Sequence, residues 1–132
     1  MATATPNGQR ILIVDDEDTL ARLMQALLEH LGYTVDRAAD GEKALRLGAQ
    51  RRYCAVICDL LMPIINGMEL FRIWQHESPE LAQRVIFVTG DNLGTRTNRF
   101  VQLSGQPCLY KPFDIQELTT TLDEVTGVYA GS

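Results

Sequence analysis

Short apolar runs alternate with stretches of helical spacing along most of the chain. The apolar runs, which contain many β-branched residues, occupy residues 11–14, 34–38, 53–58, 85–88 and 107–110. Runs of this length predict β-strands, and those without polar interruptions are typical of strands that are buried on both faces. Asp36 and Arg37 interrupt the second run, so we expect that run to form an edge strand.

A helical pattern follows each apolar run. The clearest pattern places leucine and methionine on one helix face before Gly32 ends it, at Leu20, Leu23, Met24, Leu27, Leu28 and Leu31. Weaker patterns occur around residues 44–47, 68–74, 100–103 and 115–125. Five strand–helix units predict a parallel sheet that helices cover on both faces. Right-handed crossovers then favour a doubly wound, open α/β sheet in a single domain.

Length and composition narrow the class of protein. The chain of 132 residues fits one domain, which we expect to span residues 10–126 between a flexible N-terminal tail at 1–9 and a C-terminal tail at 127–132. A net charge of −5 argues against direct binding of nucleic acid. The apolar runs are too short for membrane insertion, and the first residues lack the apolar region of a secretory signal. We therefore expect a cytoplasmic protein.

The three cysteines do not have the spacing of a metal site or of a disulfide framework. Cys54, Cys58 and Cys108 are odd in number, lack a CxxC pair and lie in apolar runs. We therefore expect small buried side chains in a reducing compartment.

Polar residues stand where the predicted strands end. Asp15 and Asp16 follow the first strand, Asp59 the third, Thr89 the fourth and Lys111 the fifth. In an open α/β sheet, reactive groups gather at these carboxyl ends. Two like charges about 4 Å apart repel by roughly 4 kcal/mol at an effective dielectric of 20, so three carboxylates need either raised pKa values or a cation. Oxygen ligands suit Mg²⁺, and such a pocket suits a phosphoryl group with Asp59 as a candidate nucleophile.

These segments together resemble the receiver domain of two-component response regulators. The matching segments are ILIVDDED, VICDLLMPIINGMEL, VIFVTGD and LYKPFDIQEL, and they cover roughly residues 9–126. The most specific match is Asp-x-x-Met-Pro-x-x-x-Gly from Asp59 to Gly67, with a later Lys-Pro-Phe that begins at Lys111. The resemblance implies a flavodoxin-like (βα)5 fold with strand order 2-1-3-4-5.

The resemblance also implies a role for each acidic residue. Asp59 would be the phosphoacceptor, taking a phosphoryl group from a histidine kinase or a histidine phosphotransfer protein. Asp16 would bind Mg²⁺ directly, Asp15 would reach the ion through water, and the backbone carbonyl of Leu61 would be a further ligand. The domain would catalyse only its own phosphorylation and dephosphorylation, and in that sense it would not be an enzyme.

Further roles follow from the same resemblance. Thr89 and Lys111 would bind phosphoryl oxygens, and Pro112 would hold the preceding turn. In this family the residues two beyond the acceptor and two beyond the threonine tune the lifetime of the acyl phosphate. Here these residues are Leu61 and Asp91.

The chain departs from the family at the switch position. The aromatic residue that usually stands three positions before the lysine is replaced by Cys108, and alternation along the strand places Tyr110 on the same face. We therefore expect the signal to be read through the loop after Thr89 and the helix at 96–104. The surface of that helix, the fifth strand and the last helix would bind a downstream protein, and it is also a candidate surface for a weak homodimer.

Alternatives remain for the origin and the function of the chain. The segment 89–113 most resembles receivers at the C-terminus of hybrid sensor histidine kinases, and a free-standing regulator is the other origin. A degenerate receiver would bind proteins without phosphorylation, although the acceptor, metal and lysine positions are all present. An Mg²⁺-dependent phosphohydrolase would need a second acid at the position of Leu61.

Overall fold

Five strands form the sheet of the computed structural model, which describes residues 9–62, 65–90 and 94–126. The strands are β1 (Arg10–Val14), β2 (Thr34–Ala38), β3 (Ala55–Asp59), β4 (Val85–Thr89) and β5 (Cys108–Tyr110). Neighbouring strands pair in parallel in the order β2-β1-β3-β4-β5. The predicted doubly wound sheet of order 2-1-3-4-5 is therefore confirmed, and the interrupted run at 34–38 forms an edge strand.

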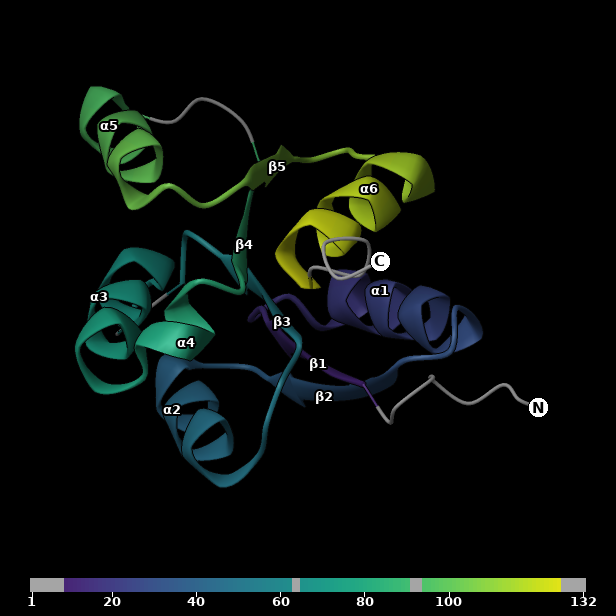
Figure 1. The fold of residues 1–132 in the computed structure, drawn as a ribbon. Coiled ribbons are helices and arrows are strands. Elements are labelled where there is room, and N and C mark those ends of the chain that lie inside the picture. Colours follow the sequence, from purple (N-terminus) through teal and green to yellow (C-terminus); the bar gives the residue numbers. More distant parts are fainter. Residues whose placement is uncertain (1–8, 63–64, 91–93, 127–132) are drawn as a thin grey trace.

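Helices cover both faces of the sheet (Figure 1). Helices α1 (Asp18–His30) and α6 (Ile115–Thr126) pack on one face, and α2 (Gly41–Gln50), α3 (Gly67–Glu77) and α5 (Thr95–Ser104) pack on the other. A short helix α4 (Pro79–Ala82) follows α3. The sequence patterns do not predict α4, because four residues that begin with proline are too few to show a helical period.

The core consists of two clusters, one on each face of the sheet. Ile11 and Ile13 of β1 lie in the cluster under α1 and α6, whereas Leu12 and Val14 lie in the cluster under α2, α3 and α5. Successive side chains of a strand point to opposite faces, so a strand covered on both faces must be apolar at every position. This requirement explains the uninterrupted apolar runs of β1, β3 and β4.

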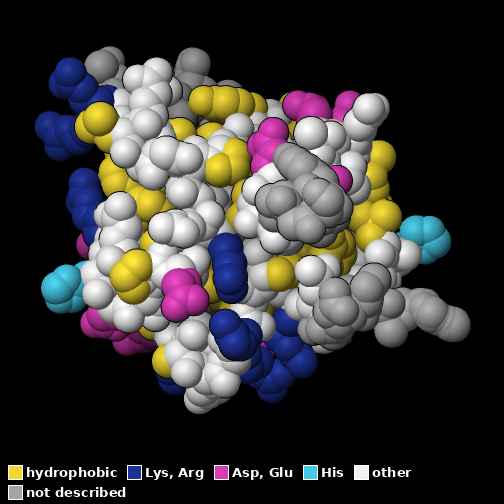
Figure 2. Space-filling model, viewed as in Figure 1, with side chains coloured by type: hydrophobic (Ala, Val, Ile, Leu, Met, Phe, Trp, Pro, Cys, Tyr) yellow, Lys and Arg dark blue, Asp and Glu magenta, His cyan; other side chains and the backbone are white. Residues whose placement is uncertain are grey.

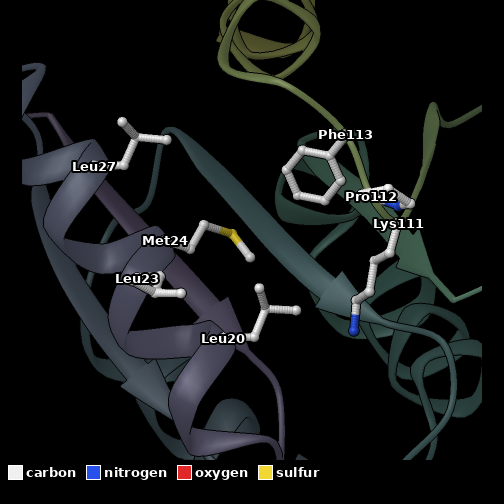
Figure 3. A pocket seen from close by; sticks show the side chains of 7 residues that line it. All are labelled: Leu20, Leu23, Met24, Leu27, Lys111, Pro112 and Phe113. Carbon is white, nitrogen blue, oxygen red and sulfur yellow. The ribbon is translucent and has the colours of Figure 1, made fainter.

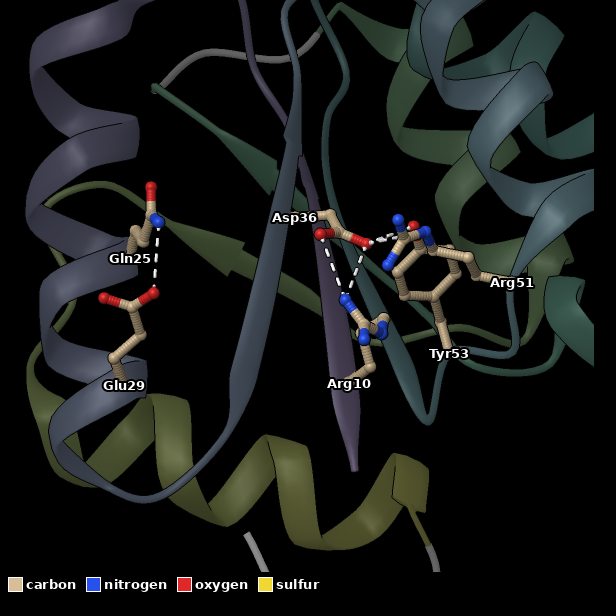
Figure 4. Close-up of polar contacts among 6 residues, drawn as sticks. All are labelled: Arg10, Gln25, Glu29, Asp36, Arg51 and Tyr53. Atoms are coloured by element: carbon tan, nitrogen blue, oxygen red, sulfur yellow. Dashed lines mark hydrogen bonds and ion pairs between the residues drawn. The ribbon is translucent and has the colours of Figure 1, made fainter. Parts of the chain in front are cut away.

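A polar network ties the edge strand β2 to its neighbours (Figure 4). The Asp36 carboxylate accepts hydrogen bonds from the Tyr53 hydroxyl at 2.7 Å and from Arg10 Nη1 at 3.2 Å, and Arg51 Nε lies 3.8 Å away. Burial and the bond to Asp36 raise the pKa of Tyr53, so the hydroxyl stays protonated and donates. Asp36, which weakens the strand pattern in the sequence, is thus satisfied at the sheet's edge.

The three cysteines differ in how deeply they are buried. All three cysteines are free, Cys58 is buried, and Cys54 and Cys108 are half-buried. Burial raises the pKa of both Cys54 and Cys108 to about 11, which keeps these thiols protonated near neutral pH.

The predicted tails at 1–9 and 127–132 lie outside the described residues, except for Gln9. The carbonyl of Gln9 accepts a hydrogen bond from the Thr34 amide at 3.1 Å, which continues the pairing of β1 with β2. Within the described residues, no helix combines the length and the apolar character that a membrane crossing requires. The cytoplasmic location stays a prediction.

The network around Asp36 generates a stability prediction. The Tyr53→Phe change removes a buried hydroxyl that donates to Asp36, whereas Arg10 and Arg51 still compensate the carboxylate. We expect the free energy of unfolding to fall by about 1 kcal/mol, measured by urea denaturation with circular dichroism. Tyr33→Phe is the matched control, because the Tyr33 hydroxyl has no hydrogen bond to another described residue. An equal loss in both variants would contradict a role for the network.

Candidate functional site

The carboxyl ends of four adjacent strands bring polar side chains to one edge of the sheet. Asp15 directly follows β1, Asp59 is the last residue of β3, Thr89 is the last residue of β4, and Lys111 directly follows β5. Because the strands are parallel neighbours, these ends meet at the same edge. The structure therefore brings together the acidic, hydroxyl and lysine residues that the sequence analysis selected.

Three carboxylates form the acidic part of the site. Asp15, Asp16 and Asp59 each place one carboxylate oxygen within 4.8 Å of the others. Asp15 is 5% exposed and Asp59 is 8% exposed, whereas Asp16 is exposed. Oxygen donors at this spacing fit a hard divalent cation such as Mg²⁺, which takes one or two carboxylates and retains waters.

Burial shapes the electrostatics of the two inner carboxylates. Desolvation raises the pKa of Asp15 and of Asp59, and hydrogen bonds from backbone amides partly offset it. The Glu17 amide donates to Asp15 Oδ1 at 2.8 Å, and the Leu61 amide donates to Asp59 Oδ1 at 3.0 Å. Amides that point at a carboxylate favour its charged form, so these two hydrogen bonds reduce the cost of burying Asp15 and Asp59 as anions, while the pKa of each stays raised overall.

Lys111 compensates both buried acids. Its Nζ lies 3.7 Å from Asp59 Oδ2 and 3.8 Å from Asp15 Oδ2, and its side chain is 22% exposed. The Lys111 amide donates to the Thr89 carbonyl at 2.8 Å, which fixes the start of the segment after β5. One ammonium against three carboxylates leaves excess negative charge, and a bound cation would relieve it.

The Thr89 hydroxyl is buried without a hydrogen-bond partner among the residues that the structure describes. Its Oγ1 is inaccessible and, among the described residues, no polar atom pairs with it. An unsatisfied buried hydroxyl costs about 1 to 3 kcal/mol, so such groups in native proteins call for an explanation. At this edge of the sheet, the hydroxyl is available to donate to an oxyanion brought to Asp59.

Glycine is required where the loop after β3 returns to the sheet. A Cβ on Gly67 would lie 2.6 Å from the Asp59 carbonyl oxygen, closer than real contacts allow. The Gly67 amide also donates to the Leu60 carbonyl at 3.2 Å. This close approach is the physical reason for the glycine that ends the Asp59–Gly67 motif. Leu61 in this loop is 63% exposed, and the metal-binding role of its carbonyl stays a prediction.

The predicted switch and tuning residues have different surroundings. Cys108 is half-buried against the core, and Tyr110 is 50% exposed and pairs in register with Thr89. Cys108 and Tyr110 both belong to β5 and are two residues apart, so alternation along the strand places them on one face. Pro112 is exposed and follows a cis peptide bond. Asp91 lies outside the described residues.

The family model for the response regulator receiver domain matches residues 11–123. The chain belongs to this family. Receiver domains of two-component systems signal through phosphorylation, bind Mg²⁺ at an acidic pocket and interact with histidine kinases or phosphotransfer proteins. The resemblance to this family that the sequence motifs indicated is therefore confirmed.

Individual relatives agree with this assignment. The response regulator ArlR of Staphylococcus aureus is 36% identical over 110 residues, which are 83% of this chain and 48% of ArlR. The chain thus spans about half the length of the curated relatives that it matches. A receiver domain from an HD domain-containing protein of Pseudomonas fluorescens Pf-5 is 28% identical, with a TM-score of 0.83 and coverage of 94% and 98%.

A third similar protein has a metal complex in its solved structure. The response regulator protein TrrA of Thermotoga maritima, whose structure is a complex with Mg²⁺–BeF, is 27% identical with a TM-score of 0.77. The match covers 89% of this chain and 98% of TrrA.

An apolar groove beside the site was not predicted (Figure 3). This groove, of about 480 Å³, runs between α1 and the segment after β5, and it is lined by Leu20, Leu23, Met24, Leu27, Lys111, Pro112 and Phe113. The sequence did contain a signal for an exposed apolar surface, because the leucine-rich face of α1 is wider than the sheet can cover. Leu23 is 65% exposed and Leu31 is 40% exposed, although both belong to the apolar pattern.

Because the Thr89 hydroxyl has no partner among the described residues, we predict that its removal stabilises the protein. Thr89→Val keeps the shape of the side chain and removes an unsatisfied buried hydroxyl, so we expect the free energy of unfolding to rise by about 1 kcal/mol. Thr121→Val is the matched control, because the Thr121 hydroxyl donates to the Glu117 carbonyl at 2.7 Å. We expect that control to lose about 0.5 to 1 kcal/mol in urea denaturation. Destabilisation by Thr89→Val would mean that the hydroxyl has a partner in the resting protein.

Proposed function

We propose that Asp59 accepts a phosphoryl group from a phosphohistidine of a histidine kinase or histidine phosphotransfer protein. A carboxylate oxygen of Asp59 attacks phosphorus, the bond from phosphorus to the imidazole nitrogen breaks, and the histidine leaves with the electron pair. The product is an acyl phosphate on Asp59. The observation that carries this proposal is the Asp59 carboxylate at the sheet edge, between two further acids and the Lys111 ammonium at 3.7 Å.

The surrounding residues hold the incoming group. Asp15, Asp16 and Asp59 would hold Mg²⁺, which when bound neutralises charge on the phosphoryl oxygens. Lys111 is released from its pair with Asp59 to bind a phosphoryl oxygen, and the Thr89 hydroxyl donates to another. The Mg²⁺–BeF complex of the related protein TrrA supports this reading.

The residue two positions beyond Asp59 argues against activity on other phosphoesters. No second acid stands two residues beyond Asp59, where Leu61 is 63% exposed. The domain therefore turns over only its own phosphoryl group, and it is not an enzyme for other substrates. We propose that Leu61 and Asp91 set how readily water reaches the acyl phosphate.

The donor would dock in the apolar groove between α1 and the segment after β5. A helix that carries phosphohistidine must bring its imidazole to Asp59, and Lys111, which contacts Asp59, also lines this groove. The side chain of Leu23 in this groove is 65% exposed. A helix with an apolar stripe fits such a groove by burying leucine surface beside the site.

Phosphorylation then changes the binding surface of α5, β5 and α6. The phosphoryl group adds about −1.5 to −2 charge at Asp59 and biases two arrangements of the adjoining loops. A downstream protein that prefers one arrangement completes the signal, and a weak homodimer would use the same surface.

The central test is direct phosphorylation. Incubation with Mg²⁺ and acetyl phosphate should add one phosphoryl group by intact mass spectrometry, and Asp59→Asn or removal of Mg²⁺ should abolish the gain. Asp36→Asn is a control acid away from the site. No gain in the wild type would favour a phosphorylation-independent binding module, and continued turnover of phosphoesters would indicate a hydrolase.

The donor groove is tested separately. Leu23→Ala should slow transfer from a phosphohistidine donor protein by about fivefold, because an exposed apolar anchor is lost. Its phosphorylation by acetyl phosphate should stay unchanged, since Leu23 is an exposed residue of α1 and is not one of the proposed phosphoryl-binding residues. Leu103→Ala is the matched control on α5, as Leu103 is 80% exposed and lies away from this groove. Equal slowing by both variants would exclude a specific role for Leu23.

A further inference from the structure

A second groove, of about 550 Å³, lies between α3 and α5 on the opposite face of the sheet from α1. Three of its lining residues are arginines, Arg72 on α3 and Arg96 and Arg99 on α5, and all three are exposed. Figure 2 shows dark blue side chains with hydrophobic ones between them over α5 and the adjoining part of α3. The described lining contains no carboxylate.

These three arginines concentrate positive charge on an acidic protein. The whole chain carries a net charge of −5. Among the described residues, the ion pairs involve other cations, namely Arg10, Arg22, Arg37, Arg51 and Lys111. The guanidinium groups of the groove thus have no carboxylate partner among the described residues, and arginine binds carboxylates in a bidentate manner.

The groove is also apolar at its base and rim. Phe100 packs against Phe71 and Phe87 with ring centroids 5.8 Å away in both cases, and Arg72 lies 5.2 Å above the Phe100 ring. This packing fixes the base of the groove to the core. Leu103 at the rim is 80% exposed, the largest value among the large hydrophobic side chains that the structure describes. A ligand for this groove should thus carry both apolar and acidic groups.

We propose that the groove between α3 and α5 binds an acidic amphipathic segment of a partner protein. An apolar side chain of the segment lies against Leu103 and Phe100, and flanking carboxylates pair with Arg96 and Arg99. Helix-in-groove recognition has this combination of apolar anchors and charged flanks. A nucleic acid fits less well, because its backbone offers no apolar anchor and the net charge of the domain repels a polyanion.

The test uses a defined probe. A fluorescein-labelled synthetic helical peptide with leucine on one face and glutamate on both flanks should bind the unphosphorylated domain saturably in fluorescence anisotropy. Two control peptides replace either glutamate with glutamine or leucine with serine, and both should bind at least about fivefold more weakly. Backbone amide shifts on titration should be confined to α3 and α5.

Matched variants locate the site. The double variant R96E/R99E should weaken peptide binding by about tenfold or more, because two attractive charges become repulsive. R46E/R52E makes the same change in net charge at exposed arginines outside the groove, and it should stay within about twofold of the wild type. Leu103→Ala should weaken binding by about fivefold, whereas Leu23→Ala should not. Circular dichroism checks the fold of each variant.

Several results would overturn the proposal. Absence of saturable binding, equal effects of the two double variants, or amide shifts centred on α1 would each exclude an acidic segment in this groove. Displacement of the peptide by a single-stranded oligonucleotide at a lower concentration than by unlabelled peptide would assign the groove to nucleic acid. Loss of self-association in R96E/R99E by sedimentation, without loss of peptide binding, would assign it to a second copy of the chain.

Discussion

The contact of one lysine with two buried carboxylates is the constraint on which the rest of the structure depends. Lys111 Nζ reaches Asp59 and Asp15 at 3.7 and 3.8 Å, and each acid is less than one tenth exposed. Removing one partner of such a group leaves an uncompensated buried charge, which costs several kcal/mol. The ends of β1, β3 and β5 must therefore stay in register. The apolar side chains on both faces of the sheet hold that register.

The sequence allowed the sheet and the edge residues to be predicted because they obey local rules. A strand buried on both faces must be apolar throughout, and a charged residue directly after it must lie at the sheet's edge. Asp15 meets this description directly after β1, Asp59 is the last residue of the buried strand β3, and Lys111 directly follows the edge strand β5, so the strand order brings the three together. Gly67 could be matched to a motif, but its physical reason, the approach to the Asp59 carbonyl, needed coordinates.

Features that join distant segments could not be predicted in the same way. The Tyr53 hydroxyl meets Asp36 across the sheet edge, and nothing in either local pattern indicates the pair. The groove between α3 and α5 combines Arg72 of α3 with Arg96 and Arg99 of α5, which α4 and β4 separate in the sequence. The exposed leucines of α1 could not be predicted for another reason. The apolar pattern does not show which leucines the sheet covers and which, such as Leu23, stay exposed.

Strand β4 and helix α5 connect the candidate functional site to the groove between α3 and α5. Phe87 lies two residues before Thr89, so both point to the same face of β4, and Phe87 packs against Phe100 of α5. Helix α5 buries only Val101 among its described side chains, whereas α1 and α6 bury three residues each. Elements with little buried apolar area open most readily. If Asp59 is phosphorylated as proposed, a movement of the end of β4 would therefore be absorbed most easily by α5.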